Sequence, residues 1–275
     1  MILTALSADA IRIVLPILVL FMSFTSLGMA VATPMMTAIS APIASQVDKE
    51  CVILLHGLAR SATAMETMQQ ALDNAGYYTV NVDYPSRNYS VEMLSAMAVP
   101  TALAQGEANN SERIHFVTHS MGGILLRDYL KEHRIAALGR VVMLGPPNQG
   151  SQVVDNLKDI PGFEAFNGPA GMQLGTRKAD IPRQLPEVDF ELGVIAGTRS
   201  INLMLSTMLP NPDDGKVSVA NTFVNGMCAH VSITVSHPYL MKRQAGIKQT
   251  FYFLQNGRFF GEEAKQFDCP AQSAL

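Results

Sequence analysis

The sequence predicts an α/β protein with a mainly parallel sheet of about six strands, flanked by helices. From about residue 46, short apolar runs rich in β-branched residues alternate with longer helix-like segments, as is typical of successive βα units. The apolar runs are continuous, which is typical of strands covered by helices on both faces. The chain has 275 residues, 48% of them hydrophobic, enough for one sizeable core. We therefore expect one globular domain over residues 46–275.

The N-terminal segment, residues 1–45, differs from the rest of the chain. Residues 13–32 carry no charge and, at about 1.5 Å per residue, are long enough to cross the hydrocarbon core of a bilayer as a helix. Arg12 precedes this run, and Ala30-Val31-Ala32 ends it with small residues. Two interpretations remain open: a signal peptide cleaved near Ala32, or an uncleaved inner-membrane anchor. The first predicts a periplasmic or secreted protein, the second membrane association, and both place the protein at the cell envelope.

Six apolar runs predict the strands of the sheet. They cover residues 51–57, 77–85, 113–119, 139–147, 190–197 and 230–237. Helix-like segments lie between or after them, at about residues 63–75, 90–105, 121–134 and 241–256. Parallel strands joined through helices require crossover connections, which we expect to be right-handed.

Residues 150–186 break this rhythm, because eight glycines and prolines from Pro161 to Pro186 interrupt any regular element. A connection of this length in a compact domain is usually a lid or a binding loop. We expect a short lid-like insertion here; a surface segment without a role is the alternative.

Three cysteines, Cys51, Cys228 and Cys269, allow at most one intramolecular disulfide. Cys228 with Cys269 is a candidate pair in an oxidising compartment, but the spacing does not establish it. None of the three lies in a CxxC motif, which argues against a zinc ribbon and a thioredoxin-like redox site.

The stretch VTHSMGG places Ser120 between a predicted strand and a predicted helix that Met121 opens. Ligands of parallel sheets bind outside the carboxyl ends of the strands, so the hydroxyl has a suitable position for chemistry. Gly122 and Gly123 allow strand and helix to approach closely at this turn. Thr118 stands where the motif G-x-S-x-G has its first glycine. The stretch predicts a nucleophile, with an ordinary turn as the alternative.

A serine hydroxyl needs a histidine to accept its proton and a carboxylate to orient that histidine. In one class of serine hydrolases these follow the serine in the order Ser, Asp or Glu, His. Asp214 lies in the turn-rich NPDDGKVSVANT, and His237 lies in SHPYL after the last predicted strand. Asp213 is the adjacent competitor for the acid.

Four segments, HGLARSATAM, VTHSMGG, PDDGKVSV and VSHPYLM, resemble in sequence and order the landmark segments of bacterial serine esterases and lipases with the α/β-hydrolase fold. The resemblance covers roughly residues 50–258. It implies Ser120 as nucleophile, Asp214 as acid and His237 as base. An oxyanion hole is also expected, formed by the backbone N–H of Met121, the residue after the nucleophile, and, by the resemblance, that of Leu58.

Other kinds of site lack a motif. His115 and His119 are four residues apart but lie on a predicted strand and lack the glutamate of HExxH, so no metal is expected. No nucleotide-binding glycine motif follows a strand, and no cofactor is expected. Asp83 and Asn148 end predicted strands, where turn roles are expected. The net charge of −3 is scattered without long runs, which argues against nucleic acid as a partner.

These observations predict hydrolysis of a carboxylic ester, either a small molecule or, in keeping with the apolar leader and insertion, a lipidic acyl ester. The same triad also serves acyltransferases, thioesterases and amidases, which remain alternatives. A non-catalytic binding protein at the cell envelope, on a hydrolase scaffold, is the alternative that Thr118 favours. The sequence indicates neither the natural substrate nor the oligomeric state.

Overall fold

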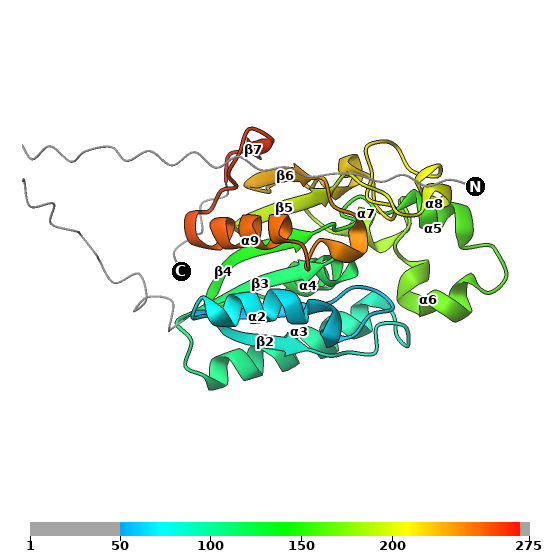
Figure 1. Ribbon diagram of the computed structural model, residues 1–275. Helices are drawn as coiled ribbons and strands as arrows, with labels where there is room; N and C mark the ends of the chain where they lie inside the picture. The colour runs from blue at the N-terminus through cyan, green and yellow to red at the C-terminus, as the bar shows by residue number, and fades with distance from the viewer. Residues whose placement is uncertain (1–49, 270–275) are drawn as a thin grey trace, which may run out of the picture. The chain divides into compact units, whose positions relative to one another are not determined.

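The computed structural model describes residues 50–269, which form a single seven-stranded sheet in the order β2-β1-β3-β4-β5-β6-β7 (Figure 1). The first six strands pair in parallel, and β7 pairs antiparallel with β6. The strands are β1 (Glu50–Leu55), β2 (Tyr78–Val82), β3 (Arg113–His119), β4 (Leu138–Leu144), β5 (Leu192–Gly197), β6 (Ala229–Ile233) and β7 (Ala264–Gln266). The α/β class with a mainly parallel sheet is therefore confirmed.

All six predicted strands occur, but four end earlier than expected. The runs 51–57, 77–85, 139–147 and 230–237 form strands only to Leu55, Val82, Leu144 and Ile233. The seventh strand was not predicted, because its three residues, Ala-Lys-Gln, contain no apolar run and are half-buried or exposed.

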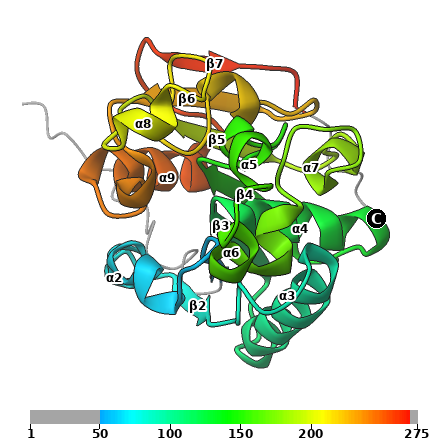
Figure 2. The ribbon, with the colours of Figure 1, turned by 90° about the vertical axis from the view of Figure 1, so that its right-hand side faces the viewer.

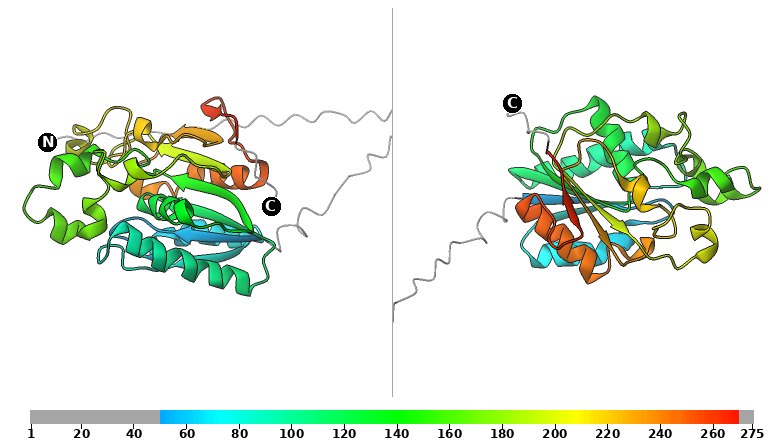
Figure 3. Two further views of the ribbon diagram at one scale, coloured as in Figure 1. Left: turned by 180° about the vertical axis from the view of Figure 1, so that it is seen from behind. Right: turned by 90° about the horizontal axis from the view of Figure 1, so that it is seen from above.

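The helices form one layer on each face of the sheet (Figures 2 and 3). Helices α3 and α4 pack against one face, and α2 and α9 against the other. Their bounds are η1 (Ala62–Met65), α2 (Glu66–Asn74), α3 (Val91–Ala108), α4 (Met121–Glu132) and α9 (Gln244–Asn256). The expected helix at 63–75 is thus a 3₁₀ turn followed by a shorter α-helix.

Side-chain alternation along the central strands explains the two layers. On β1, Ile53 and Leu55 join the core under α3 and α4, whereas Val52 and Leu54 join the core under α2 and α9. Successive side chains of a strand point to opposite faces, so a strand that is apolar at every position contributes side chains to both cores.

The insertion at 150–186 contains α5 (Gln152–Leu157), α6 (Phe163–Met172) and α7 (Ile181–Gln184). It follows the carboxyl end of β4, and α5 and α6 lie in front of the strand ends (Figure 2). Another short helix, α8 (Leu203–Ser206), follows β5, and the 3₁₀ turns η2 (Val219–Thr222) and η3 (His237–Tyr239) flank β6.

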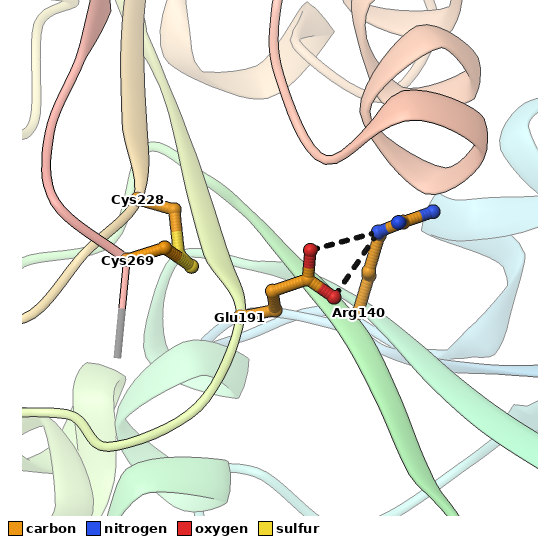
Figure 4. Close-up of a disulfide and its surroundings, with 4 residues drawn as sticks. All are labelled: Arg140, Glu191, Cys228 and Cys269. Carbon is orange, nitrogen blue, oxygen red and sulfur yellow. Dashed lines mark hydrogen bonds and ion pairs between the residues drawn. A yellow bond between two sulfur atoms is a disulfide. The ribbon is translucent and has the colours of Figure 1, made fainter. Parts of the chain in front are cut away.

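At the β7 edge, Cys228 and Cys269 form a disulfide with a Cα–Cα distance of 4.4 Å (Figure 4). The bond joins the residue before β6 to the segment after β7. Nearby, the Nε of Arg140 on β4 donates to both carboxylate oxygens of Glu191, at 3.1 and 3.2 Å (Figure 4). Cys51 is a buried free thiol, and burial raises its pKa to about 12.

The expected leader and tether, residues 1–45, lie outside the described residues. Within residues 50–269, no helix combines the length and the apolar character that a membrane span requires.

Candidate active site

Ser120 lies on the tight turn between β3 and α4, with φ 54° and ψ −122°. A non-glycine residue with positive φ is strained, and such strain concentrates at functional sites. The turn requires Gly122, because a Cβ on residue 122 would lie 2.6 Å from the carbonyl oxygen of Leu55 and 2.8 Å from that of His56. The neighbouring strand β1 therefore leaves no room for a side chain beside the serine.

Thr118, the departure from G-x-S-x-G, is fully buried on β3. A Cβ on residue 123 would lie 3.1 Å from its Oγ1, so the second glycine, Gly123, provides the space that the threonine occupies. The turn at Ser120 forms despite this departure.

His237 begins the short turn η3 after β6, and its Nε2 lies 2.9 Å from the Oγ of Ser120. Its backbone N–H donates to the carbonyl oxygen of Asp214 at 3.1 Å. The imidazole is buried, with only 7% of the residue exposed. The structure thus brings together two residues that are 117 positions apart in the chain.

Asp214 is buried and orients the histidine. Its Oδ2 lies 2.6 Å from the Nδ1 of His237, and its Oδ1 accepts the N–H groups of Lys216 and Val217 at 3.0 and 2.8 Å. Two backbone donors thus hold the carboxylate. This arrangement matches a tautomer in which Nδ1 donates to Asp214 and Nε2 accepts from the serine hydroxyl.

Asp213 is not placed to serve as the acid. Its Oδ1 accepts the N–H of Gly215 at 2.7 Å, and its Oδ2 accepts the hydroxyl of Ser206 at 2.6 Å. Both oxygens stabilise the turn itself. Of the two adjacent carboxylates, the structure brings Asp214 to His237.

His119 is a site residue whose position the sequence reasoning missed, since it considered this side chain only as a metal ligand. The Nε2 of His119 donates to the backbone carbonyl of His237 at 3.1 Å, and the two rings lie 4.8 Å apart. Burial, together with the nearby His237, lowers its pKa well below the ordinary value, so it is neutral. The sequence signal that could have indicated this role is the position of His119, directly before Ser120 at the end of a buried strand.

The expected oxyanion-hole residues lie where β1 and β3 end. Met121 opens α4, and Leu58 lines the pocket that also contains Ser120. Within residues 50–269, neither backbone N–H donates a hydrogen bond to another group of the chain. Both amides are therefore free to bind an anionic oxygen.

His56 holds the loop that carries Leu58. Its ring stacks on Tyr84 with a centroid distance of 3.8 Å, and its Nε2 accepts the N–H of Tyr84 at 3.3 Å. The hydroxyl of Tyr84 in turn donates to the carbonyl oxygen of His56. Burial lowers the pKa of His56. The neutral ring fits this accepting role.

A cavity of about 410 Å³ opens at Ser120 and His237. This volume is in the range of sites for small ligands. The insertion forms its apolar wall, with Val153, Val154, Leu157, Phe163, Phe166 and Leu174. Arg60 and Lys216 also line the cavity.

The remaining polar candidates have structural contacts. His115 accepts the N–H of Arg140 at 2.8 Å and faces Glu50 at 3.3 Å. Asn148 donates to the carbonyl of Thr222 at 2.8 Å. In the part of the chain that the structure describes, no cluster of three metal-ligating side chains occurs.

Comparison with protein families gives one match, to the model described as palmitoyl protein thioesterase, over residues 51–181. This range contains Leu58, Ser120 and Met121 but ends before Asp214 and His237. No curated protein matches the chain in sequence.

Solved structures share the fold at low sequence identity. The mature form of the Bacillus licheniformis lipase BlEst2 aligns with a TM-score of 0.59 and 20% identity, covering 76% of this chain and 92% of the lipase. Aspergillus fumigatus lipase B aligns with a TM-score of 0.54 and 15% identity, covering 76% and 53%. A metagenomic carboxyl esterase aligns with a TM-score of 0.53 and 16% identity, covering 70% and 66%.

These matches confirm the α/β-hydrolase fold and, with the family model, point to the serine esterases and lipases of that fold. Residues 51–181 are thus similar to a thioesterase family, and the neighbours of the fold are lipases and an esterase.

Proposed function

We propose that this α/β-hydrolase cleaves carboxylic esters, with lipidic acyl esters as the favoured class, through an acyl-enzyme on Ser120. In this proposal His237 is the general base and acid, and Asp214 orients it. The backbone N–H groups of Leu58 and Met121 stabilise the oxyanion.

The observation that carries the proposal is the hydrogen-bonded series from Ser120 through His237 to Asp214, with distances of 2.9 and 2.6 Å. A general base must lie within about 2.6–3.2 Å of the group whose proton it takes, and Nε2 meets this requirement. The series ends at the buried carboxylate of Asp214, whose negative charge would stabilise the imidazolium that forms on His237 during the reaction.

The reaction proceeds in two halves. Nε2 of His237 takes the proton of Ser120 as Oγ attacks the acyl carbon, and the alcohol oxygen then leaves with that proton. Water enters, gives a proton to the same Nε2 and attacks the acyl carbon. The carboxylic acid departs as Oγ recovers its proton.

The apolar wall of the cavity supports a lipidic acyl group. Its side chains come from α5, α6 and the residues around them. Phe166 both lines the cavity and is 67% exposed, so apolar surface continues from the cavity to the outside of the insertion. An acyl chain entering along this wall would leave water, and each buried CH₂ would contribute about 0.8 kcal/mol.

A thioesterase is the second candidate, and the match of residues 51–181 to the palmitoyl protein thioesterase model favours it. Oxygen esters and thioesters with the same acyl chain separate the two activities. A kcat/KM at least tenfold higher for the thioester across all chain lengths would favour the thioesterase.

The decisive variant is Ser120→Ala. We expect a loss of hydrolysis of about 10⁴-fold or more, because the nucleophile is removed. Labelling by a fluorophosphonate probe should disappear as well. Ser200→Ala, in the loop after β5, is the matched control and should retain both. Circular dichroism checks that each variant folds.

Each alternative has its own outcome. A folded Ser120→Ala protein that retains most activity would reject the assignment. Wild-type protein that neither turns over esters nor reacts with the probe would support the non-catalytic binding protein. Negligible hydrolysis with strong transfer to an added alcohol would favour an acyltransferase.

The proposal also includes a location at the cell envelope, either periplasmic or secreted after cleavage near Ala32, or anchored to the inner membrane. The Cys228–Cys269 disulfide supports this part, because disulfides persist mainly in oxidising compartments. Fractionation of cells that express the tagged full chain tests it.

A further inference from the structure

The cavity at Ser120 has two chemically different walls. The insertion supplies the apolar wall, whereas Arg60 and Lys216 supply positive charge beside Ser120 and His237. No aspartate or glutamate is among the residues that line this cavity in the described chain. An apolar ester alone would give these cations no partner.

Arg60 and Lys216 form no salt bridge with a described residue, although the carboxylate of Asp214 attracts Lys216. Across residues 50–269, neither the guanidinium of Arg60 nor the ammonium of Lys216 forms an ion pair or a side-chain hydrogen bond. Desolvation lowers the pKa of Lys216, the positive charge of Arg60 lowers it further, and the negative charge of Asp214 partly offsets both. Like charges that face one cavity repel each other, and an anion bound between them would relieve this repulsion.

Positive charge continues beyond the cavity. Arg60 and Ala59 also line a neighbouring hollow of about 450 Å³, together with Lys242 and the polar Ser61 and Thr63. An ester whose alcohol portion extends from Ser120 toward Arg60 would therefore meet positive charge, while its acyl chain contacts the apolar side chains of the insertion.

The carboxylates near this region already have partners. Asp214 holds His237 and two backbone amides. Asp83 accepts the N–H of Ala62 at 2.9 Å and lies 3.5 Å from the Nε2 of His56. Asp214 attracts Lys216 electrostatically, but neither carboxylate forms a salt bridge with Arg60 or Lys216.

We propose, building on the esterase function above, that Arg60 and Lys216 select esters whose alcohol portion carries a negative charge. Lys242 extends this anion-binding surface. The group recognised is a phosphate or a carboxylate a few bonds from the ester oxygen. The reaction itself is unchanged: His237 protonates the departing oxygen, and the anionic alcohol leaves along the cationic wall.

The test compares esters of one short acyl chain, which stay monomeric in water. Three alcohols of similar size are glycerol, glycerol 3-phosphate and choline, which are neutral, anionic and cationic. Wild-type protein should show the highest kcat/KM with the phosphate ester and the lowest with the choline ester. Glycerate, with a carboxylate, separates phosphate recognition from recognition of any anion.

The variants are Arg60→Gln and Lys216→Gln, made separately. Each should lower the ratio of kcat/KM for the anionic ester to that for the neutral ester by about fivefold, the upper range for one exposed charge pair. Lys248→Gln, an exposed lysine on α9, is the charge-matched control and should leave the ratio unchanged. Raising the salt concentration should lower the wild-type ratio, because exposed charges are screened.

The outcomes separate this inference from the esterase proposal. Equal hydrolysis of all three esters would overturn anion selection while leaving the esterase intact. An anionic preference that survives both substitutions would also overturn it. Failure of every ester, together with absent fluorophosphonate labelling of Ser120, would instead overturn the proposed function.

Discussion

The turn at Ser120 and the insertion at 150–186 border the same cavity, but different kinds of contact hold them. At the turn, backbone atoms crowd one another, since a Cβ on Gly122 would meet two carbonyl oxygens of the chain leaving β1. A Cβ on Gly57 would likewise lie 2.9 Å from the ring of His119. The turn can therefore form only because Gly57 and Gly122 lack side chains.

Polar side chains hold the insertion instead. Asp155 accepts both the N–H and the hydroxyl of Thr176, and Asp180 accepts the N–H of Arg177. Lys158 pairs with Asp180 at 3.4 Å, and both side chains are largely buried. These contacts join the two ends of the insertion.

Arg127 on α4 connects the insertion to the body of the fold. Its guanidinium donates to the carbonyl oxygens of Leu185 and Pro186 and to the Oδ1 of Asn148. We therefore expect changes at the turn to alter catalysis, and changes at the insertion to alter stability and substrate range.

The largest effect is expected for Asp214→Asn, which leaves the shape of the site but not the orienting carboxylate. An asparagine favours the wrong histidine tautomer, so kcat should fall by about 10³- to 10⁴-fold. Asp213→Asn is the control one residue away, and kcat should change by less than about threefold, because its contacts serve the turn. Equal losses in both variants would contradict the assignment of the acid.

The next effect is expected for Gly122→Ala. The added Cβ must displace either α4 or the end of β1, which shifts Ser120 relative to His237. A displacement of about 1 Å costs about a hundredfold in rate. Steady-state kinetics and probe labelling measure the loss. Gly162→Ala, where a Cβ meets open space but φ is 91°, is a control that strains the insertion only.

At the insertion, Arg127→Met should lower the free energy of unfolding by about 2 kcal/mol, because Asn148, Leu185 and Pro186 lose their hydrogen-bond donor. We expect KM for long-chain esters to change more than kcat for short ones. Urea denaturation and a chain-length series measure the two effects. Arg134→Met removes an exposed pair with Asp189 and should change stability by less than about 0.5 kcal/mol.

The pH dependence of His230 provides a baseline outside both regions. Burial lowers the pKa of His230 to about 4. Above about pH 6.5 its imidazole is therefore mainly neutral in both the folded and the unfolded state. Below that pH the unfolded state gains the proton first, and stability falls as the pH drops toward 4, by up to about 3 kcal/mol. In His230→Gln this part of the loss in unfolding free energy should be absent. Denaturation experiments at about pH 6.5 and at about pH 4 measure it. Ester preference at neutral pH should not change.

The sequence predicted much of the site because its signals are local. The turn at Ser120 follows from a strand, a serine and two glycines within seven residues, and the order of Asp214 and His237 follows from two further loops. The local sequence does not show whether Asp213 or Asp214 contacts the histidine. Both stand in the same turn, and only the hydrogen bonds to Ser206 and His237 distinguish them.

The roles of other residues depend on contacts distant in sequence. His119 contacts the backbone of residue 237, and Arg60 and Lys216 line the same cavity from different loops. Strand β7 has no apolar pattern of its own and pairs with a strand more than thirty positions earlier in the chain. None of these contacts leaves a periodic signal.

The sequence by itself determined the α/β class, the parallel order of apolar strands and the positions of the three polar side chains along the chain. The tertiary structure alone decided which side chains meet at the strand ends, which wall of the cavity is apolar and which is cationic. The physical reason is that strand and helix patterns arise from neighbours within a few residues, whereas a site is assembled by loops that the packed sheet brings together.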